Sequence, residues 1–411
     1  MRSRSFLRRL AVRNFKSIGT CDVSFGPLTV LVGRNGAGKS NFLDSLRFVA
    51  DGLQTSLDHA IKSRGGIDAV RRLSTGHPRN FSIRVDFEVN GASARFATYA
   101  FEIAARTSGT FAVKRERLTI SDHAYRVLAK FEREESKITE ATTRTDREPV
   151  VPPVLEDRLY LVNAAGLPDF RPAYDALLSM GFYNLNPDAM KGVQSPDAGE
   201  LLHGNGANIA SVVARLTAHQ PEAIDRIKAY LSSIVPGIEN FGRESLGPKE
   251  TLVFWQRVEG AQSPWKFYAS SMSDGTLRTL GALVAVTQLA GGSQSIKLVG
   301  IEEPETALHP AAAGALMDAL REASSHTQVV VTTHSPDLLD QVDPANDTLL
   351  VVAARGATSR VAVADQASLT AIQKHLYSPG ELLRMDQLQP DLQDLARQEQ
   401  LDLFTDATPV E

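Results

Sequence analysis

The stretch Gly33-Arg34-Asn35-Gly36-Ala37-Gly38-Lys39-Ser40 matches the pattern G-x-x-x-x-G-K-[ST] at every fixed position. Residues 28–32, directly before it, form a short apolar, β-branched run that predicts a buried strand. Residues 41–49, directly after it, carry apolar side chains at helical spacing. This strand–loop–helix context favours a phosphate-binding loop over a glycine-rich turn with an incidental lysine.

The residue types of this loop suit a nucleotide and its metal ion. Glycines lack a Cβ, so successive backbone N–H groups can turn inward and surround a phosphate at the positive end of the helix. Lys39 is expected to pair with the β and γ phosphates, and Ser40 is expected to ligate Mg²⁺. The predicted nucleotide-binding residues are Gly33, Arg34, Asn35, Gly36, Ala37, Gly38, Lys39, Ser40 and Asn41.

Composition sets the class of protein. The chain has 411 residues, a formal net charge of −4 and one cysteine, Cys21. This length suffices for one large or two medium-sized domains. A single cysteine excludes an internal disulfide framework and a cysteine-based zinc site. Because no apolar run reaches the roughly 18 residues of a membrane span and the start lacks a secretory signal, we expect a cytoplasmic protein with no membrane partner.

The first third of the chain predicts antiparallel strands. Residues 6–12 and 21–25 predict two strands around a turn at residues 14–19. Their arginines fit a nucleic-acid contact and a solvated sheet edge equally well. Alternating apolar residues then predict an antiparallel meander. Its strands are residues 81–89, 96–103 and 111–120, and its turns are Asn90-Gly91 and Ser108-Gly109.

The middle of the chain changes character twice. Residues 130–149 are rich in charged residues and threonine, which predicts a flexible surface segment or a short helical excursion. Helical patterns dominate residues 168–235, and no sustained heptad pattern supports a long coiled-coil arm. Residues 252–255 and 265–269 predict strands whose aromatic side chains are better explained by sheet packing than by base stacking.

Two further motifs carry chemistry in the second half. Ser273-Asp274-Gly275-Thr276 precedes a helix-like run, so Ser273 Oγ and free backbone N–H groups form a second anion site, although the same residues are common in turns and caps. Residues 296–301 predict an apolar strand that ends in Glu302 and Glu303. Glu302 is expected to face Mg²⁺, and Glu303 is expected to act as the base that polarises the attacking water. The alternative is an acidic helix start.

A histidine follows the next predicted strand. Residues 328–331 are apolar and lead into Thr332-Thr333-His334-Ser335. A lone histidine after a strand is usually structural. However, α/β sheets bind ligands at the carboxyl ends of parallel strands, where the loop lysine and the two glutamates are also expected. His334 is therefore predicted to hydrogen-bond the γ phosphate or hold the water, which makes Lys39, Glu303 and His334 the predicted catalytic residues.

The order of these motifs resembles the ABC-type ATPases of the RecF, SMC and OLD group, also called AAA-21 or predicted-ATPase proteins. The resemblance covers residues 1 to about 355. It implies an α/β fold, a P-loop ABC-type ATPase head with a parallel core sheet, an antiparallel β meander and a helical insert lobe. It also implies that residues 273–276 are the signature motif, Glu302 the Walker B acid, Glu303 the catalytic glutamate, Leu308–Pro310 the D-loop region and His334 the switch histidine.

The same resemblance implies cofactors and partners. ATP and Mg²⁺ are the cofactors, and Ser273 and Gly275 of one protomer contact the nucleotide of the other in a homodimer or higher homo-oligomer. Further implied partners are DNA and a separately encoded nuclease or other effector, in DNA transactions or defence against phage. Two positions depart from the family pattern, Glu302 in place of aspartate and His309 in the D-loop region. The Q-loop residue stays open among Gln194, Asn184 and Asn186.

We expect four parts, which are an N-terminal ATPase lobe (1–130), a charged linker with helical insert (131–250), a C-terminal ATPase half (251–364) and an acidic tail (365–411). The tail ends in an acidic run with Leu401-Asp402-Leu403-Phe404, which suits docking onto a basic partner surface or a solvated terminal helix. It contains no Asp-x-Asp, so we expect no built-in TOPRIM nuclease.

Three functions fit these motifs. An ATP-hydrolysing switch is favoured, and a nucleotide-dependent scaffold with negligible turnover is the alternative. A transporter-type ABC subunit is disfavoured by the large insert, by the Ser-Asp-Gly-Thr signature and by the lack of a membrane segment.

Overall fold

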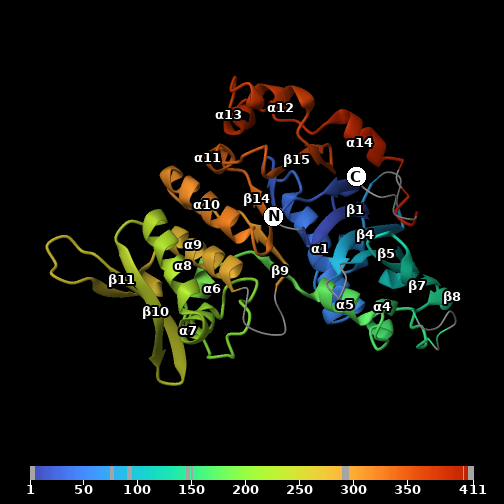
Figure 1. Cartoon of the computed structure of the whole chain (residues 1–411), viewed down its shortest axis with the longest axis horizontal. Helices are drawn as coiled ribbons and strands as arrows, with labels where there is room; N and C mark the ends of the chain where they lie inside the picture. The colour runs from blue at the N-terminus through green and yellow to red at the C-terminus, as the bar shows by residue number, and fades with distance from the viewer. Residues whose placement is uncertain are drawn as a thin grey trace.

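The computed structural model describes residues 5–74, 78–89, 95–144, 149, 151–288, 296–400 and 402–405. Within these residues a 13-stranded sheet has the order β8-β7-β6-β5-β4-β1-β2-β16-β15-β3-β14-β13-β9, and a 3-stranded sheet has the order β10-β11-β12. In Figure 1 the helical lobe with the small sheet lies to one side of the large sheet, and the last helices, drawn in red, run along its top.

The strands are β1 (Leu7–Phe15), β2 (Ile18–Ser24), β3 (Leu28–Val32), β4 (Asn80–Val89), β5 (Arg95–Ala105), β6 (Phe111–Ser121), β7 (Val127–Glu134), β8 (Lys137–Thr142), β9 (Met180–Tyr183), β10 (Ile238–Leu246), β11 (Lys249–Gln256), β12 (Trp265–Tyr268), β13 (Leu298–Glu302), β14 (Gln328–Thr333), β15 (Thr348–Arg355) and β16 (Thr358–Val363). The helices are α1 (Lys39–Gln54), α2 (Leu57–Lys62), α3 (Ile67–Val70), α4 (Tyr160–Ala164), α5 (Arg171–Leu178), α6 (Pro187–Lys191), α7 (Ile209–His219), α8 (Pro221–Ile234), α9 (Asp274–Thr287), α10 (Ala313–Ala323), α11 (Pro336–Leu339), α12 (Gln366–Gln373), α13 (Pro379–Arg384) and α14 (Leu392–Gln398).

The parallel part of the large sheet brings three motif-bearing strands together. β14 lies between β3 and β13, with Val331 opposite Val30 on one side and Ile301 on the other. All three strands run in the same direction, so their carboxyl ends meet at one edge of the sheet. This arrangement confirms the predicted α/β fold class with a parallel core sheet, and it confirms the strands predicted before each motif.

The antiparallel part of the sheet confirms the meander. β4, β5 and β6 pair in succession, with Ile83 opposite Phe101 and Tyr99 opposite Leu118. A short 3-10 turn over Thr107–Gly109 joins β5 to β6. The turn predicted at Asn90-Gly91 lies outside the described residues.

The prediction of a flexible or helical segment over residues 130–149 is wrong where the structure describes it, because β7 and β8 extend the sheet there. More exposed side chains alternate with buried ones in β7. Phe131 and Arg133 are buried, whereas Lys130 forms an ion pair with Glu140 across the strands at 2.5 Å. High charge density therefore conceals a period of two. The division into four parts stays a prediction, although β7 crosses the boundary drawn after residue 130.

The first hairpin is tighter than the sequence suggests. The turn predicted over residues 14–19 is wrong in extent, because β1 continues to Phe15 and β2 begins at Ile18. Asn14 and Lys16 adopt positive φ angles of 56° and 48°. These left-handed residues let the chain reverse within two residues.

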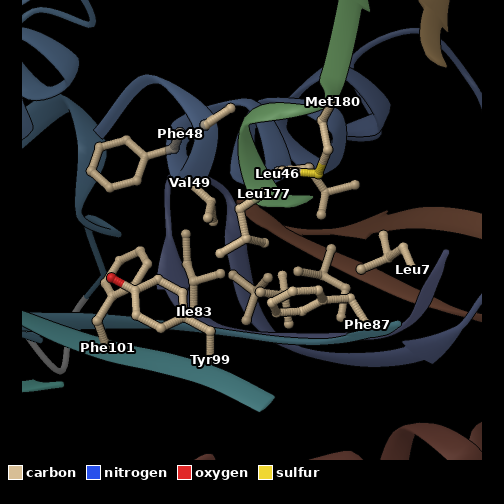
Figure 2. Close-up of a cluster of buried hydrophobic side chains, with 14 of the residues drawn as sticks. Leu7, Leu46, Phe48, Val49, Ile83, Phe87, Tyr99, Phe101, Leu177 and Met180 are labelled. Atoms are coloured by element: carbon tan, nitrogen blue, oxygen red, sulfur yellow. The ribbon is translucent and has the colours of Figure 1, made fainter. Parts of the chain in front are cut away.

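Two hydrophobic cores lie on opposite faces of the parallel strands. In β3, Leu31 belongs to the core around α1, whereas Val30 and Val32 belong to the core of the helical lobe. Figure 2 shows the first core, in which Phe48 of α1 lies 6.2 Å from Phe101 of the sheet between ring centroids. Full burial of each such ring contributes about 1.5–3 kcal/mol. This core therefore fixes α1 and, with it, the loop that precedes α1.

The sequence pattern did not reveal two strands, β9 at one edge of the large sheet and β10 in the small sheet. β9 lies between helices α5 and α6 in the chain, and β10 follows α8. The predicted strands at residues 252–255 and 265–269 are present as β11 and β12. Sheet packing accounts for Phe254, which is buried, but not for Trp265, which is 57% exposed. No described helix is both long and apolar enough to span a membrane.

The last described residues, 402–405, are docked on the protein itself. Leu403 and Phe404 are buried against Ala11 and Ala100 of the antiparallel strands. The expectation of a solvated terminal helix is therefore wrong for these residues, and the basic surface that they contact belongs to the same chain. Leu401 lies outside the described residues.

Candidate functional site

The predicted phosphate loop connects β3 to α1. Gly36 and Gly38 have φ angles of 78° and 106°, which L-residues with a side chain rarely adopt. The Lys39 ammonium is buried and donates to the carbonyl oxygens of Gly33 at 2.8 Å and Arg34 at 3.3 Å. Burial lowers the pKa of Lys39, while the Glu303 carboxylate opposes that shift. The loop is thus folded around the lysine.

Neighbouring strands explain why two of these positions are glycine. A Cβ on Gly33 would lie 2.2 Å from the carbonyl oxygen of Val352 in β15. A Cβ on Gly38 would lie 2.0 Å from Ser359 Oγ in β16. Both distances are far below van der Waals contact. The loop therefore packs directly against the two strands that follow the last motif in the chain.

The predicted metal-facing residues lie together. Ser40 Oγ donates to Glu302 Oε2 at 2.5 Å, across the gap between the ends of β3 and β13. A hydroxyl and a carboxylate are hard oxygen ligands that suit Mg²⁺, which commonly takes one or two protein ligands together with water and phosphate oxygens. The described residues contain no cluster of three or more His, Cys, Asp or Glu side chains that would hold a metal by themselves. Ser40 and Glu302 therefore fit a magnesium ion shared with a nucleotide.

The predicted catalytic residues converge beside this pair. Glu303 Oε1 lies 3.7 Å from Lys39 Nζ and 3.1 Å from His334 Nδ1. The Glu303 backbone has a φ of 43°, and its N–H donates to the carbonyl oxygen of Thr332 at 3.0 Å. Strain of this kind often occurs at functional sites. His334 Nδ1 is buried, and apart from this contact with Glu303 it has no hydrogen-bond partner among the described residues.

Glu305 is a site residue that the sequence analysis missed. It is 8% exposed, and its Oε1 accepts a short hydrogen bond from Thr333 Oγ1. Thr333 Oγ1 in turn accepts from the Ser335 N–H at 3.0 Å. Burial raises the pKa of Glu305. This carboxyl joins the loop of Glu303 to the loop of His334, and its place in Glu302-Glu303-Pro304-Glu305 was the available signal.

The predicted signature residues form no hydrogen bond with the phosphate loop of their own chain within the described residues. Ser273 caps α9, and its Oγ accepts from the Thr276 N–H at 3.2 Å. A Cβ on Gly275 would lie 2.2 Å from the carbonyl oxygen of Ala307, in the loop that follows Glu303. Among the described residues, no hydrogen bond or ion pair connects Ser273 or Gly275 to the phosphate loop of the same chain.

Residues at the turn of the first hairpin, between β1 and β2, hold α1, the helix that follows the phosphate loop, through a hydrogen bond and an ion pair. Ser17 Oγ accepts from Asn41 Nδ2 at 2.6 Å and lies 2.7 Å from Ser359 Oγ. Lys16 forms a 2.7 Å ion pair with Asp44 of α1. Only the fold brings these residues together, because Ser17 and Ser359 are 342 positions apart in the chain.

The three candidates for the Q-loop separate clearly. Gln194 is buried in the helical lobe, where its amide contacts Met190 and Ala210. Asn186 caps α6. Asn184 directly follows β9, whose last residue Tyr183 pairs with Ile301 of β13. Asn184 therefore follows β9 at the end of the sheet where Glu302 follows β13.

Comparison with known proteins agrees with this geometry. Residues 28–161 and 194–340 match the family described as AAA domain, putative AbiEii toxin, Type IV TA system. A stretch of 46 residues is 44% identical to the DNA replication and repair protein RecF of Streptococcus uberis, and it spans 11% of this chain and 13% of that relative.

Solved structures show the same fold at low sequence identity. The Smc head domain with an extended coiled coil, bound to the C-terminal domain of ScpA, from Pyrococcus furiosus matches with a TM-score of 0.51 and 13% identity, over 90% of this chain and 99% of that chain. An SmcHead bound to the C-winged helix domain of ScpA matches with a TM-score of 0.50 and 15% identity, over 87% and 97%. The chain therefore belongs to the AAA-domain family that its residues match, and it shares the fold of the Smc head domains.

Proposed function

We propose that this protein binds Mg-ATP and hydrolyses it slowly, as a switch. The observation that carries the proposal is the convergence of Lys39, of the Ser40–Glu302 pair and of the Glu303–His334 pair at the carboxyl ends of three adjacent parallel strands. Phosphoryl transfer needs positioning and charge stabilisation more than covalent chemistry, and these side chains supply both.

Each side chain has a distinct role in the proposed reaction. Lys39 exchanges its loop carbonyls for the β and γ phosphates, and the loop N–H groups surround them. Ser40 and Glu302 would hold Mg²⁺, which neutralises charge on the phosphate oxygens when bound. Glu303 accepts a proton from the attacking water, and His334 orients the water or donates to the γ phosphate. Asn184 lies at the same end of these strands, and we assign it the role of the Q-loop residue.

We further propose that the active form is a homodimer. Ser273 and Gly275 of one protomer would contact the nucleotide held by the other, since the start of α9 offers a serine hydroxyl and free N–H groups. Gly275 also packs on the loop that carries Glu303 in its own chain. A change in the position of Gly275 when nucleotide binds across the interface would therefore be passed to the loop of Glu303 by the contact with Ala307.

The proposed setting is a DNA transaction or defence against phage in the cytoplasm, with DNA and a separately encoded nuclease or other effector as partners. The support is the short match to RecF, whose name states a role in DNA replication and repair, and the family description as a putative toxin of a toxin–antitoxin system. A nucleotide-dependent scaffold with negligible turnover is the second candidate. Lys39 is held by a carbonyl oxygen of its own loop, which suits slow exchange of that contact for nucleotide phosphates and supports this second candidate.

Light scattering on the Glu303→Gln variant tests the dimer. With Mg-ATP the variant should shift from a smaller to a larger species and stay there, because hydrolysis no longer releases the nucleotide. The Lys39→Ala variant is the control and should not shift. A Glu303→Gln variant whose mass ignores Mg-ATP would contradict the proposal, and a wild type that dimerises without turnover would favour the scaffold.

A further inference from the structure

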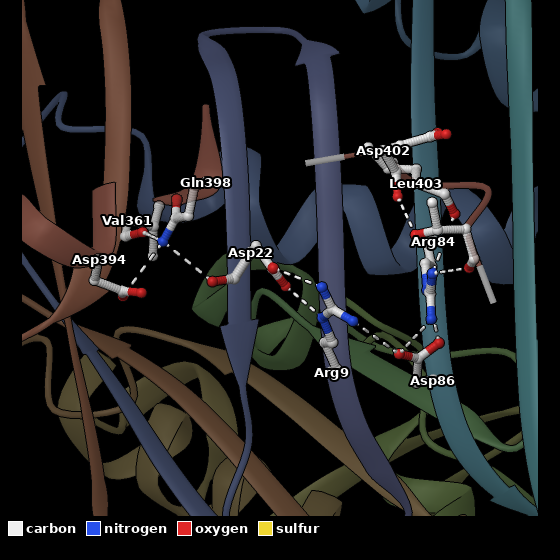
Figure 3. A network of polar contacts seen from close by, with 10 residues as sticks. Arg9, Asp22, Arg84, Asp86, Val361, Asp394, Gln398, Asp402 and Leu403 are labelled. Carbon is white, nitrogen blue, oxygen red and sulfur yellow. Dashed lines mark hydrogen bonds and ion pairs between the residues drawn. The ribbon is translucent and has the colours of Figure 1, made fainter. Parts of the chain in front are cut away.

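The large sheet has one weak junction, and a side-chain amide from the tail bridges it. β2 and β16 pair at a single position, Ser359 opposite Ile18, within the described residues. Further along, Gln398 of α14 enters between the two strands. Its Nε2 donates to the carbonyl oxygens of Asp22 in β2 and Val361 in β16, both at 3.1 Å (Figure 3). The tail thus supplies hydrogen bonds that the strands do not make with each other.

The chain then continues to a hollow on the antiparallel strands. Ala11, Arg84 and Ala100 lie opposite one another on β1, β4 and β5. The two alanines leave space on either side of the arginine. Leu403 and Phe404 pack into this space and become buried. Small residues at these two positions are therefore matched by large ones at the end of the chain.

Three arginines fasten the same segment. Arg84 Nη1 donates to the carbonyl oxygen of Thr405 at 2.8 Å, and Arg117 Nη1 donates to that of Phe404 at 2.6 Å. The Arg115 guanidinium lies 4.4 Å from the centroid of the Phe404 ring. Hydrogen bonds from charged donors are stronger than neutral ones. The docking is therefore specific, and it joins the tail to the antiparallel half of the sheet.

The weak junction ends at the phosphate loop. Ser359 N–H donates to the carbonyl oxygen of Ser17 at 2.8 Å, and the two hydroxyls lie 2.7 Å apart. Ser17 accepts from Asn41 of α1, and Gly38 packs on Ser359. Val361, which contacts Gln398, is two residues from Ser359 along β16, about 7 Å at the rise of a strand. Movement at the junction would therefore displace the support of the loop.

We propose that α14 and residues 402–405, here called the strap, position the phosphate loop by holding β2 against β16. The strap therefore increases the affinity for Mg-ATP. Because coupling between two binding events is reciprocal, bound Mg-ATP must tighten the strap by the same factor. The inference rests on the proposed binding of ATP, and it adds an element outside the site that sets how tightly the nucleotide is held.

The variants Phe404→Ala and Gln398→Ala test the strap in the full chain. Both should raise the dissociation constant of a fluorescent ATP analogue about tenfold, within the usual range of coupling, and should raise KM more than they lower kcat. Leu392→Ala is the matched control on α14, because Leu392 is 73% exposed, and it should bind the analogue as the wild type does. A global loss of structure would instead lower kcat and the cooperativity of unfolding.

The reciprocal measurement needs no variant. Trypsin cleavage after Arg397, an exposed residue of α14, should slow about tenfold in saturating Mg-ATP, because local opening of the strap becomes rarer. Cleavage at the same rate with and without Mg-ATP would overturn the inference. Wild-type affinity in both folded variants would also overturn it and would leave the proposed ATP binding intact. Failure of the wild type to bind the analogue would instead refute the proposed function.

Discussion

Replacing Gly38 with alanine tests how closely the phosphate loop packs on β16. Gly38 has a φ of 106°, and an added Cβ would lie 2.0 Å from Ser359 Oγ and 2.8 Å from Ser359 Cβ. The left-handed backbone costs an L-residue about 1–2 kcal/mol, and forcing a methyl group into a packed region costs about 1–3 kcal/mol more. Gly38→Ala should therefore lower the free energy of unfolding by about 2–5 kcal/mol and weaken binding of Mg-ATP.

Gly36, in the same loop, is the control for the cost of placing an L-residue at a positive φ. Gly36 has a φ of 78°, and nothing lies within 4 Å of a Cβ added there. Gly36→Ala should therefore cost only the conformational term, about 1–2 kcal/mol. Adding Ser359→Gly to Gly38→Ala removes the clash, so the double variant should recover most of the difference between the two single variants.

Urea unfolding followed by circular dichroism, together with nucleotide titration, gives both quantities for the four proteins. The comparison isolates the contact with Ser359, because Gly36→Ala and Gly38→Ala share the cost of a positive φ. Equal destabilisation by the two single variants would refute the close approach of the loop to β16. Failure of Ser359→Gly to rescue Gly38→Ala would refute it as well.

Three further outcomes are expected. Ser40→Ala removes the hydroxyl that lies 2.5 Å from Glu302. The Mg²⁺ concentration for half-maximal hydrolysis should therefore rise about tenfold, which a Mg²⁺ titration of phosphate release measures. An unchanged Mg²⁺ concentration would exclude Ser40 as a ligand. His334→Ala should lower kcat about 100-fold or more and leave the affinity for ATP nearly unchanged, as steady-state assays would show. If the histidine were purely structural, its loss would lower both kcat and the affinity. Burial raises the pKa of Glu305 above its ordinary value of 4.5, so its neutral form stabilises the fold below about pH 4.5 and this contribution is lost as the pH rises through the folded pKa. Glu305→Gln should therefore gain stability relative to the wild type as the pH rises, measured by urea unfolding from pH 4 to 8, and a constant difference would contradict a raised pKa.

The motifs could be predicted from the sequence because each one is local. Lys39, Glu303 and His334 each follow an apolar run of about strand length, and the carboxyl ends of parallel strands share one edge of a sheet. That rule needs no long-range information, and the structure brings these three residues together. What the sequence does not supply is the partner strand of each run.

The features that the sequence could not supply depend on distant contacts. Ser17 and Ser359 are ordinary serines until the fold places their hydroxyls 2.7 Å apart. From the sequence, Glu305 is one more acidic residue of a charged motif. Its role depends on the hydrogen bond that Thr333 donates to it in the folded protein. The strands over residues 130–142 were hidden by their charges. Buried Arg133 finds its partners only in the fold, in Glu116 of the neighbouring strand and in the carbonyl oxygens of Leu155 and Arg158.

The acidic tail is a second case in which the sequence could not identify a distant contact. Its composition predicted either docking onto a basic surface of a partner or a solvated helix, and a composition does not say which chain supplies a docking surface. Arg84 and Arg117 of the same chain do so here. Their positions on β4 and β6 lie about 300 residues from the tail in sequence, beyond the reach of any local pattern.

The central claim is that the loops after β3, β13 and β14 carry the residues that hydrolyse Mg-ATP. The most direct test is phosphate release by the wild type beside Glu303→Gln, with binding of a fluorescent ATP analogue measured on the same preparations. The account predicts slow release by the wild type, at least about 100-fold less by the variant, and equal nucleotide affinity for both. Equal release by both proteins would contradict the role of Glu303, and binding without release by either would leave only a nucleotide-dependent scaffold.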